Sequence, residues 1–328
     1  AQSLTLSLSP GQEESDYRLR WFNPSIHDSP YSGGFDLYIR DRIYEKYTDT
    51  RTGMNVSVGR RFFRRLQVGM EAIWEGILIH DIDTDDDEDE DEDEEEEDGE
   101  EDVLDVAKDI LKARGHHEKR ALALKASYDT RDYYYWPTKG YRLDFRVESA
   151  GSFLGGDVDT LTETFEANKY WTLWKQPKRG DHILHLRGKV GFIQPTNSSG
   201  YVPIFQRFFA GGLGSIRGFD YRGIGPVDDE WEQQIGGKVL MIGNLEYFYP
   251  ILDKYLHAVL FVDAGKVDRH TSDFNLERIR VATGFGARIR LPILGMGNVP
   301  IILDFGFPVV KEKTDDEDVF SFSMGTGF

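Results

Sequence analysis

The sequence contains no cysteine among its 328 residues. This absence excludes disulfide frameworks, thiolate metal sites and cysteine nucleophiles. The chain also has no run approaching the roughly 18 consecutive apolar residues of a membrane-spanning helix. A helical membrane protein is therefore excluded, whereas a membrane β-barrel stays open because barrel strands carry their apolar residues in alternation.

Signatures of the common enzyme classes are absent too. The eight histidines show no spacing typical of metal ligands, and there is neither a G-x-S-x-G elbow nor a phosphate-binding loop. We therefore expect no catalytic residue, no metal site and no cofactor. No signal peptide is recognisable, since the chain opens with Ala1-Gln2-Ser3, and we expect any export signal to be cleaved or to lie outside this sequence.

The formal net charge of −19 belongs to one segment. Between Asp81 and Asp102 there are 19 acidic residues and no basic one, and without them 39 acidic residues stand against 39 Lys and Arg. The charge therefore says little about the rest of the chain, and we expect no nucleic-acid partner. We interpret the run as a solvated, disordered loop. Calcium binding by its carboxylates and pairing with a basic partner are the alternatives.

Two-residue alternation is plentiful. From Tyr141 to Glu148, apolar Tyr, Leu, Phe and Val alternate with Arg, Asp, Arg and Glu, and residues 278–291 repeat the pattern. Such strands fit a soluble β-sandwich with a wet outer face, or a membrane barrel with a wet interior. Strands of ten to fourteen residues favour the barrel, since a tilted spanning strand takes about 9–11 residues. Aromatic clusters at 133–136, 170–174 and 247–249 favour it as well, as interface girdles.

The alternation predicts fourteen antiparallel strands in an all-β fold, with two long connections. One connection, residues 81–117, combines the acidic run with a short amphipathic helix over 103–114, which we expect to cap a solvent-facing extracellular loop. The other, residues 194–236, is rich in glycine and aromatic residues. We place the strands near 2–9, 15–23, 34–47, 53–63, 67–81, 118–130, 140–150, 159–174, 181–193, 237–250, 256–267, 278–292, 299–310 and 319–328.

The most specific segment lies in the second connection, where Ser215-Ile-Arg-Gly-Phe219 stands among closely spaced glycines. It resembles the (V/I)-R-G-(F/Y) signature of the Omp85 superfamily, which includes the BamA and TamA assembly factors and the two-partner secretion transporters. Other segments resemble further family motifs in the expected order: Asp129-Thr-Arg-Asp132 with Pro137-Thr-Lys-Gly140, then residues 243–250, Phe261-Val-Asp-Ala-Gly265, and the ending at 320–328.

The resemblance implies a sixteen-stranded transmembrane barrel in which the 194–236 loop folds into the lumen. There Arg217, followed by Gly218 and Phe219, would be locked by Glu246 and Asp263 on neighbouring inner walls. Alternation agrees in part, because both acids stand between apolar neighbours and should face inward. The planar guanidinium suits carboxylate partners. Without the resemblance, a surface-loop arginine would explain the motif as well.

The resemblance also implies a function. The last strand, with Phe320, Phe322, Gly325 and Phe328, would meet the first strand at a weak lateral seam. Strands of unfolded client proteins would be templated there and released into the lipid bilayer of the bacterial outer membrane. Accessory assembly subunits are further expected partners. A protein-translocating pore of the two-partner secretion or TamA type is the alternative, and the arginine motif argues against a passive porin-like channel.

Two features depart from the family pattern. POTRA domains do not precede the barrel in this sequence, and fourteen strands are recognisable where the family has sixteen. Either the first two strands are absent from this chain, or neighbouring strands are merged in our assignment. The seam and the assembly activity both depend on that N-terminal end.

Overall fold

The described residues form a single antiparallel sheet of fourteen strands, in which each strand pairs with its neighbours in sequence. The computed structural model describes residues 2–83, 106–134, 136–176, 180–252, 255–273, 275, 277–293 and 297–324. The all-β antiparallel class and the fourteen strands predicted from alternation are confirmed. The strands are β1 (Ser3–Ser9), β2 (Glu14–Asn23), β3 (Tyr31–Ile43), β4 (Thr48–Phe62), β5 (Leu66–His80), β6 (Gly115–Asp129), β7 (Gly140–Ala150), β8 (Thr160–Gln176), β9 (Gly180–Pro195), β10 (Val239–Leu252), β11 (Leu256–Asp268), β12 (Arg280–Ile293), β13 (Gly297–Val310) and β14 (Phe320–Met324).

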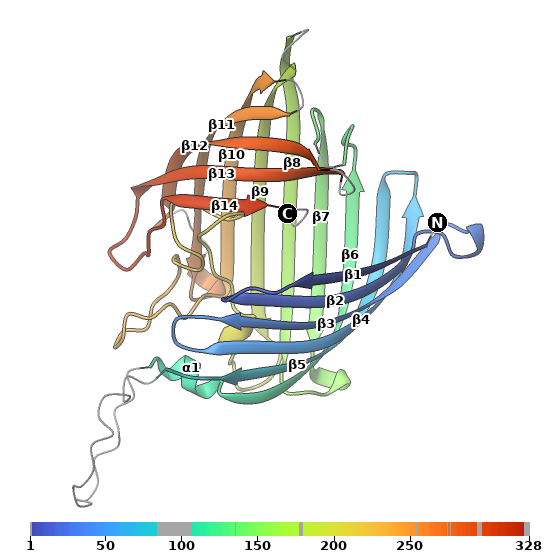
Figure 1. Ribbon diagram of the computed structural model, residues 1–328. Coiled ribbons are helices and arrows are strands. Elements are labelled where there is room, and N and C mark those ends of the chain that lie inside the picture. Colours follow the sequence, from blue (N-terminus) through green and yellow to red (C-terminus); the bar gives the residue numbers. More distant parts are fainter. Residues whose placement is uncertain are drawn as a thin grey trace, which may run out of the picture.

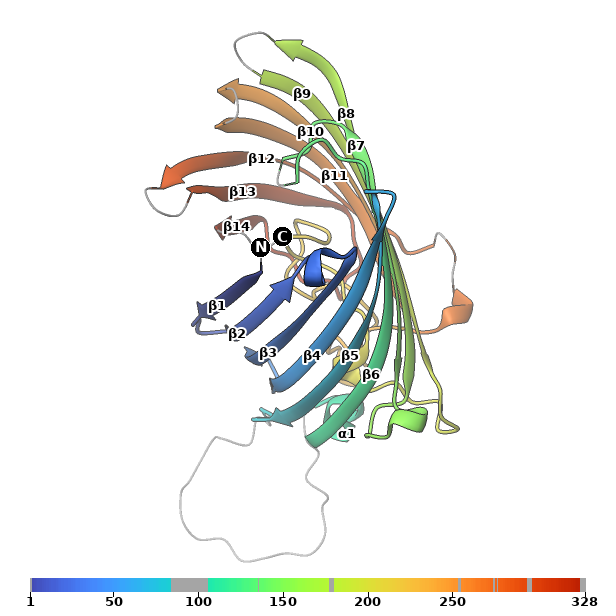
Figure 2. The ribbon, with the colours of Figure 1, turned by 90° about the vertical axis from the view of Figure 1, so that its right-hand side faces the viewer.

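The sheet curves round on itself to form an open barrel (Figure 1). Within the described part of the chain, β1 pairs with β2 and β14 pairs with β13, and the two edge strands share no ladder with each other. Figure 2 shows these edges facing one another across the opening. Because the fourteen strands are separate, merging of neighbours does not explain why fewer than sixteen were recognised.

Alternation gives the strands an apolar outer face and a polar inner face. On β7 the outward Phe145 is 46% exposed, whereas the neighbouring Arg146 points inward and donates to Glu71 of β5 over 2.7 Å. A soluble sheet would bury its apolar face, so this exposed surface is the one that lipid covers. The exposed outward residues include Leu124, Leu186, Leu245, Leu260, Phe285 and Phe305, and the expected girdle residues Trp171, Trp174 and Tyr249 are exposed as well.

The first long connection carries helix α1 (Lys108–Lys112), which is shorter than the predicted 103–114. Ala107 has an extended backbone (φ −53°, ψ 132°), so the helix begins after it. Residues 84–105, with most of the acidic run, lie outside the described residues. One face of the helix is buried at Ile110, as are Val106 and Ala107 just before it, whereas Lys108 and Lys112 are exposed. None of the described helices is long and apolar enough to cross a membrane.

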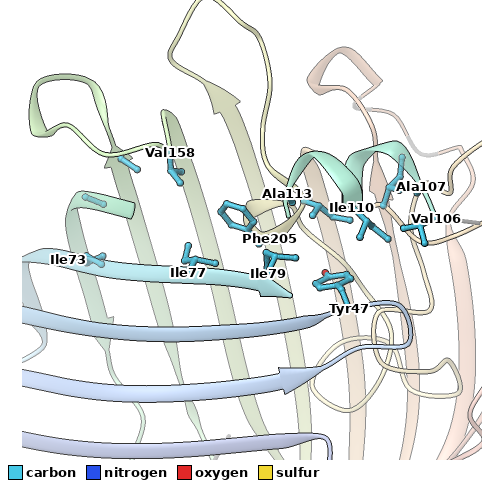
Figure 3. Close-up of a cluster of buried hydrophobic side chains, with 14 of the residues drawn as sticks. Tyr47, Ile73, Ile77, Ile79, Val106, Ala107, Ile110, Ala113, Val158 and Phe205 are labelled. Carbon is cyan, nitrogen blue, oxygen red and sulfur yellow. The ribbon is translucent and has the colours of Figure 1, made fainter. Parts of the chain in front are cut away.

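An apolar cluster lies inside the sheet around the α1 segment (Figure 3). Ile77 and Ile79 of β5 meet the α1 segment from one side, and Phe205 of the second long connection meets it from another. The amphipathic spacing around α1 therefore serves contact with the inside of the sheet rather than with a partner outside.

Candidate functional site at the arginine loop

The second long connection, residues 196–238 between β9 and β10, lies inside the curved sheet (Figure 2). We call it the arginine loop. Ile216, Phe219 and Ile224 are fully buried and pack against inward-facing residues of the wall, among them Leu240 and Val267. The apolar residues flanking Arg217 thus fix the position from which its side chain reaches the wall.

Backbone approach is closest at Gly218. Its φ of 91° lies in the left-handed region, which glycine adopts without steric cost. A Cβ at this position would lie 2.9 Å from the carbonyl carbon of Gly306 on β13. Glycine is therefore required on both sides of the contact, since a Cβ on Gly306 would lie 2.5 Å from the Gly218 nitrogen.

Arg217 is held by three carboxylates on three strands. Its Nε and Nη2 donate to the two oxygens of Asp263 on β11, over 2.7 and 2.8 Å. Its Nη1 donates to Glu246 on β10 over 2.7 Å and to Asp304 on β13 over 3.1 Å. The guanidinium also lies 3.6 Å from the ring centroid of Phe261. Charge-assisted, bidentate hydrogen bonds of this kind are short and geometrically specific.

The charged side chains that hold Arg217 are buried, which makes their pairing important for stability. The side chains of Asp263 and Asp304 have no exposed surface, and those of Arg217 and Glu246 are 6% and 13% exposed. Charges removed from water in this way persist only with opposite charges and hydrogen bonds around them. The structure thus brings together Arg217, Glu246 and Asp263, the residues that the sequence comparison with the family singled out.

Two members of the network were missed from sequence. Asp304 of β13 accepts from Arg217 and also from Arg288 of β12, over 2.5 and 3.0 Å. Arg288 also reaches Glu246 at 3.3 Å. The available signal was parity, because Asp304 stands between Leu303 and Phe305 and must face inward. We name Arg217, Glu246, Asp263, Arg288 and Asp304 the arginine network.

The network continues toward β8 and β9 through His185. One ring nitrogen of His185 lies 2.9 Å from Glu246, and the other lies 3.0 Å from Asn168. Nearby, Arg187 of β9 donates to the carbonyl of Gly214 in the arginine loop over 2.5 Å. Polar side chains from β8 to β13 therefore hold the middle of the loop.

A second ion pair fixes the start of the loop to α1. Arg207 donates to both oxygens of Asp109 over 2.9 and 3.0 Å. Burial would raise the pKa of Asp109, but the hydrogen bonds and the charge of Arg207 outweigh it and lower this pKa below its ordinary value. The acid therefore stays ionised, and α1 stays attached to the arginine loop, well below neutral pH.

The predicted seam residues divide into two groups. Phe320 and Phe322 lie on β14 with side chains 45% and 56% exposed, on its outward face. Gly325 and Phe328 lie outside the described residues. In the part of the chain that the structure describes, no group of three or more His, Asp or Glu side chains is arranged to hold a metal ion.

Comparison with known proteins agrees with this architecture. The chain is 28% identical over 310 residues to the outer membrane protein assembly factor BamA of Nitratidesulfovibrio vulgaris. The aligned region covers 93% of this chain and 35% of that protein. It is 31% identical over 163 residues to a SAM50-like protein of Schizosaccharomyces pombe, covering 48% of the chain and 33% of that protein. The chain thus spans about a third of the length of these relatives.

Among solved structures, the BamA of Haemophilus ducreyi lacking POTRA domains 1–3 has the same fold, with a TM-score of 0.77 and 17% identity. That likeness covers 99% of this chain and 64% of the other. The family model of the Omp85 superfamily domain matches residues 1–328. The chain therefore belongs to the Omp85 superfamily of outer-membrane β-barrel proteins.

Proposed function

We propose that this barrel belongs to a BamA-like assembly factor that folds client β-barrel proteins into the outer membrane. The single observation that carries the proposal is the open edge between β1 and β14, which lack a shared ladder in the described residues. The BamA relatives support it as homologues named for outer-membrane protein assembly. The clients are unfolded outer-membrane proteins, and accessory subunits assist in delivering them.

The mechanism is strand templating by backbone hydrogen bonds. An unpaired edge strand presents a row of N–H and C=O groups that an incoming strand can use, which is β-augmentation. Within the described residues, the ladder between β13 and β14 joins five residue pairs, from Phe320 to Met324. Leu4, Leu6 and Leu8 on β1 expose more than 60% of their side chains, so a strand added at this edge reaches lipid directly.

The arginine network acts as the lock that keeps the C-terminal wall rigid while the seam exchanges strands. Through Arg217 it joins β10, β11 and β13 to the loop, and Arg288 adds β12 by its bonds to Asp304 and Glu246. β13 is the strand on which β14 is paired. Templating needs a fixed edge, because a drifting edge would lose register with its client. No nucleotide, metal or covalent step is involved, and the free energy comes from burial of the client's own strands.

The end of the barrel that carries the two long connections, β5–β6 and β9–β10, is the extracellular end in this proposal. The short turns at the opposite end then face the periplasm, where clients arrive. The apolar cluster and the arginine loop lie inside this end of the barrel, where they narrow the path for solutes.

A folding assay tests the proposal. The protein is reconstituted in liposomes, an unfolded outer-membrane barrel is added, and the fraction folded is followed by electrophoretic mobility. We expect faster folding than in empty liposomes, and small, unstable currents in planar bilayers. Folding at the rate of empty liposomes contradicts templating, and large stable currents would instead favour a protein-translocating pore.

A further inference from the structure

Four residues of the arginine loop, Asp220 to Gly223, contact the turn before β14 on one side of the open seam and, on the other side, the end of β3 with the β3–β4 turn, two strands in from β1. We call this segment the clasp. Through its backbone it binds the turn that leads into β14, and through its side chains it binds the turn between β3 and β4. Neither set of contacts involves the carboxylates that hold Arg217.

The C-terminal side is held by main-chain hydrogen bonds. The N–H of Asp220 donates to the carbonyl of Asp316 over 2.9 Å, and the N–H of Asp316 donates to the carbonyl of Gly223 over 3.0 Å. A Cβ on Gly223 would lie 2.8 Å from the Asp316 carbonyl oxygen, so only glycine lets the two segments approach this closely. Asp316 lies four residues before β14, so the clasp fixes the entry to the last strand.

The N-terminal side is held by side chains. Arg222 lies over the Tyr44 ring with its guanidinium carbon 4.3 Å from the centroid, and its Nη1 donates to the Tyr47 hydroxyl over 2.9 Å. Arg42 at the end of β3 donates to the Tyr221 hydroxyl and lies 4.9 Å from that ring's centroid. Guanidinium–aromatic contacts of this kind are attractive, and more so when desolvated.

The backbone of Arg222 carries strain that these contacts explain. Its φ of 64° lies in the left-handed region, which costs a non-glycine residue energy that surrounding contacts must offset. The guanidinium carbon also lies 3.2 Å from the ring centroid of Phe209. Two aromatic rings and the Tyr47 hydroxyl thus hold the side chain in place, and this holds the strained backbone.

The shortest way round the sheet from the β13–β14 turn to the β3–β4 turn crosses the seam. The clasp therefore spans the opening where β1 and β14 lack a shared ladder. We propose that Tyr221 and Arg222 are positioning residues that hold the two seam edges at a set separation, so that releasing the clasp widens the seam. The inference rests on the seam of the proposed function, but it concerns seam geometry without any client.

Distance measurements between spin labels test the clasp directly. Because the chain has no native cysteine, Leu6→Cys on β1 and Phe322→Cys on β14 are labelled without competing thiols. Both side chains point outward and are more than half exposed, so labels fit there without repacking. We expect Arg222→Ala, in the absence of client, to shift the distance distribution to longer values and to broaden it.

Variants of Tyr44 and Tyr47 in the β3–β4 turn test the same contacts without changing the sequence of the arginine loop. Tyr47→Phe removes only the hydroxyl that accepts from Arg222. Tyr44→Leu removes the ring beneath Arg222, together with its contact to the Tyr47 ring. We expect the two changes together to reproduce the Arg222→Ala shift. Arg60→Ala is the matched control, because Arg60 lies over the rings of Tyr31 and Phe62 at the opposite end of β3 and β4.

Several outcomes overturn the proposal. A distribution unchanged in Arg222→Ala, or one that Arg60→Ala shifts equally, removes the clasp as the element that sets the separation. A seam that widens while client folding remains at the rate of empty liposomes supports the clasp and contradicts the templating function. The two failures are therefore distinguishable.

Discussion

Replacing Arg217 by alanine removes the cation at the centre of the arginine network. Four side-chain hydrogen bonds are lost, and Asp263 keeps only those from Asn244 and the backbone of residue 217. Asp304 keeps Arg288, so the uncompensated charge falls mainly on Asp263, which has no exposed surface. Breaking a buried pair from one side costs about 3–5 kcal/mol, and we expect a loss of that size in the free energy of unfolding.

Arg142→Ala is the matched control. Arg142 makes two hydrogen bonds of 2.7 and 2.8 Å to Asp144, but both side chains are 33% exposed. A screened pair of this kind contributes about 1 kcal/mol or less. Urea titration in detergent micelles, followed by electrophoretic mobility, measures both variants. If Arg217→Ala costs no more than Arg142→Ala, the reasoning that burial makes the network important is refuted.

Two further changes follow from the geometry. Gly218→Ala places a Cβ against β13 at a left-handed φ, whereas Gly214 has a similar φ of 83° but nothing within 4 Å of a Cβ. We expect Gly218→Ala to lower the free energy of unfolding in urea by about 1–3 kcal/mol more than Gly214→Ala does. Equal losses of stability would show that the close approach to Gly306 is unimportant. Asp109→Asn removes the pair with Arg207 and should cost about 1 kcal/mol at pH 7 after screening. Because the folded pKa of Asp109 is lowered, the stability from ionisation of this pair is present above the unfolded pKa and is lost as pH falls through the lowered folded pKa. The difference between wild type and Asp109→Asn should therefore shrink in unfolding measured below about pH 4, and a constant difference would contradict the pairing.

Strand number and strand faces were predictable because alternation is a local signal. Each strand needs only its own residues to show which side is apolar, and residues 141–148 show this as clearly in the sequence as in β7. The inward direction of Glu246 and Asp263 follows from the same rule. That both acids contact Arg217 was predicted only from the resemblance to the family. Alternation shows which way a side chain points but not how far it lies from another residue.

The remaining contacts depend on how the loop lies against the wall. Asp304 and Arg288 enter the network because Gly218 lets the loop touch β13, and no local pattern reports that contact. The pairing of Arg222 with Tyr44 joins segments nearly 180 residues apart in the chain. The amphipathic spacing near α1 was visible, but spacing does not show that the apolar face of the helix packs against the inside of the barrel.

Bridging the seam with a cleavable thiol cross-linker tests the templating proposal most directly. The double variant Leu6→Cys, Phe322→Cys is reconstituted in liposomes, cross-linked between β1 and β14, and assayed for folding of an outer-membrane barrel client. We expect the cross-linked protein to fold clients no faster than empty liposomes do, and reductive cleavage of the linker to restore the wild-type rate. Client folding that proceeds at the wild-type rate with the seam cross-linked would contradict templating between β1 and β14.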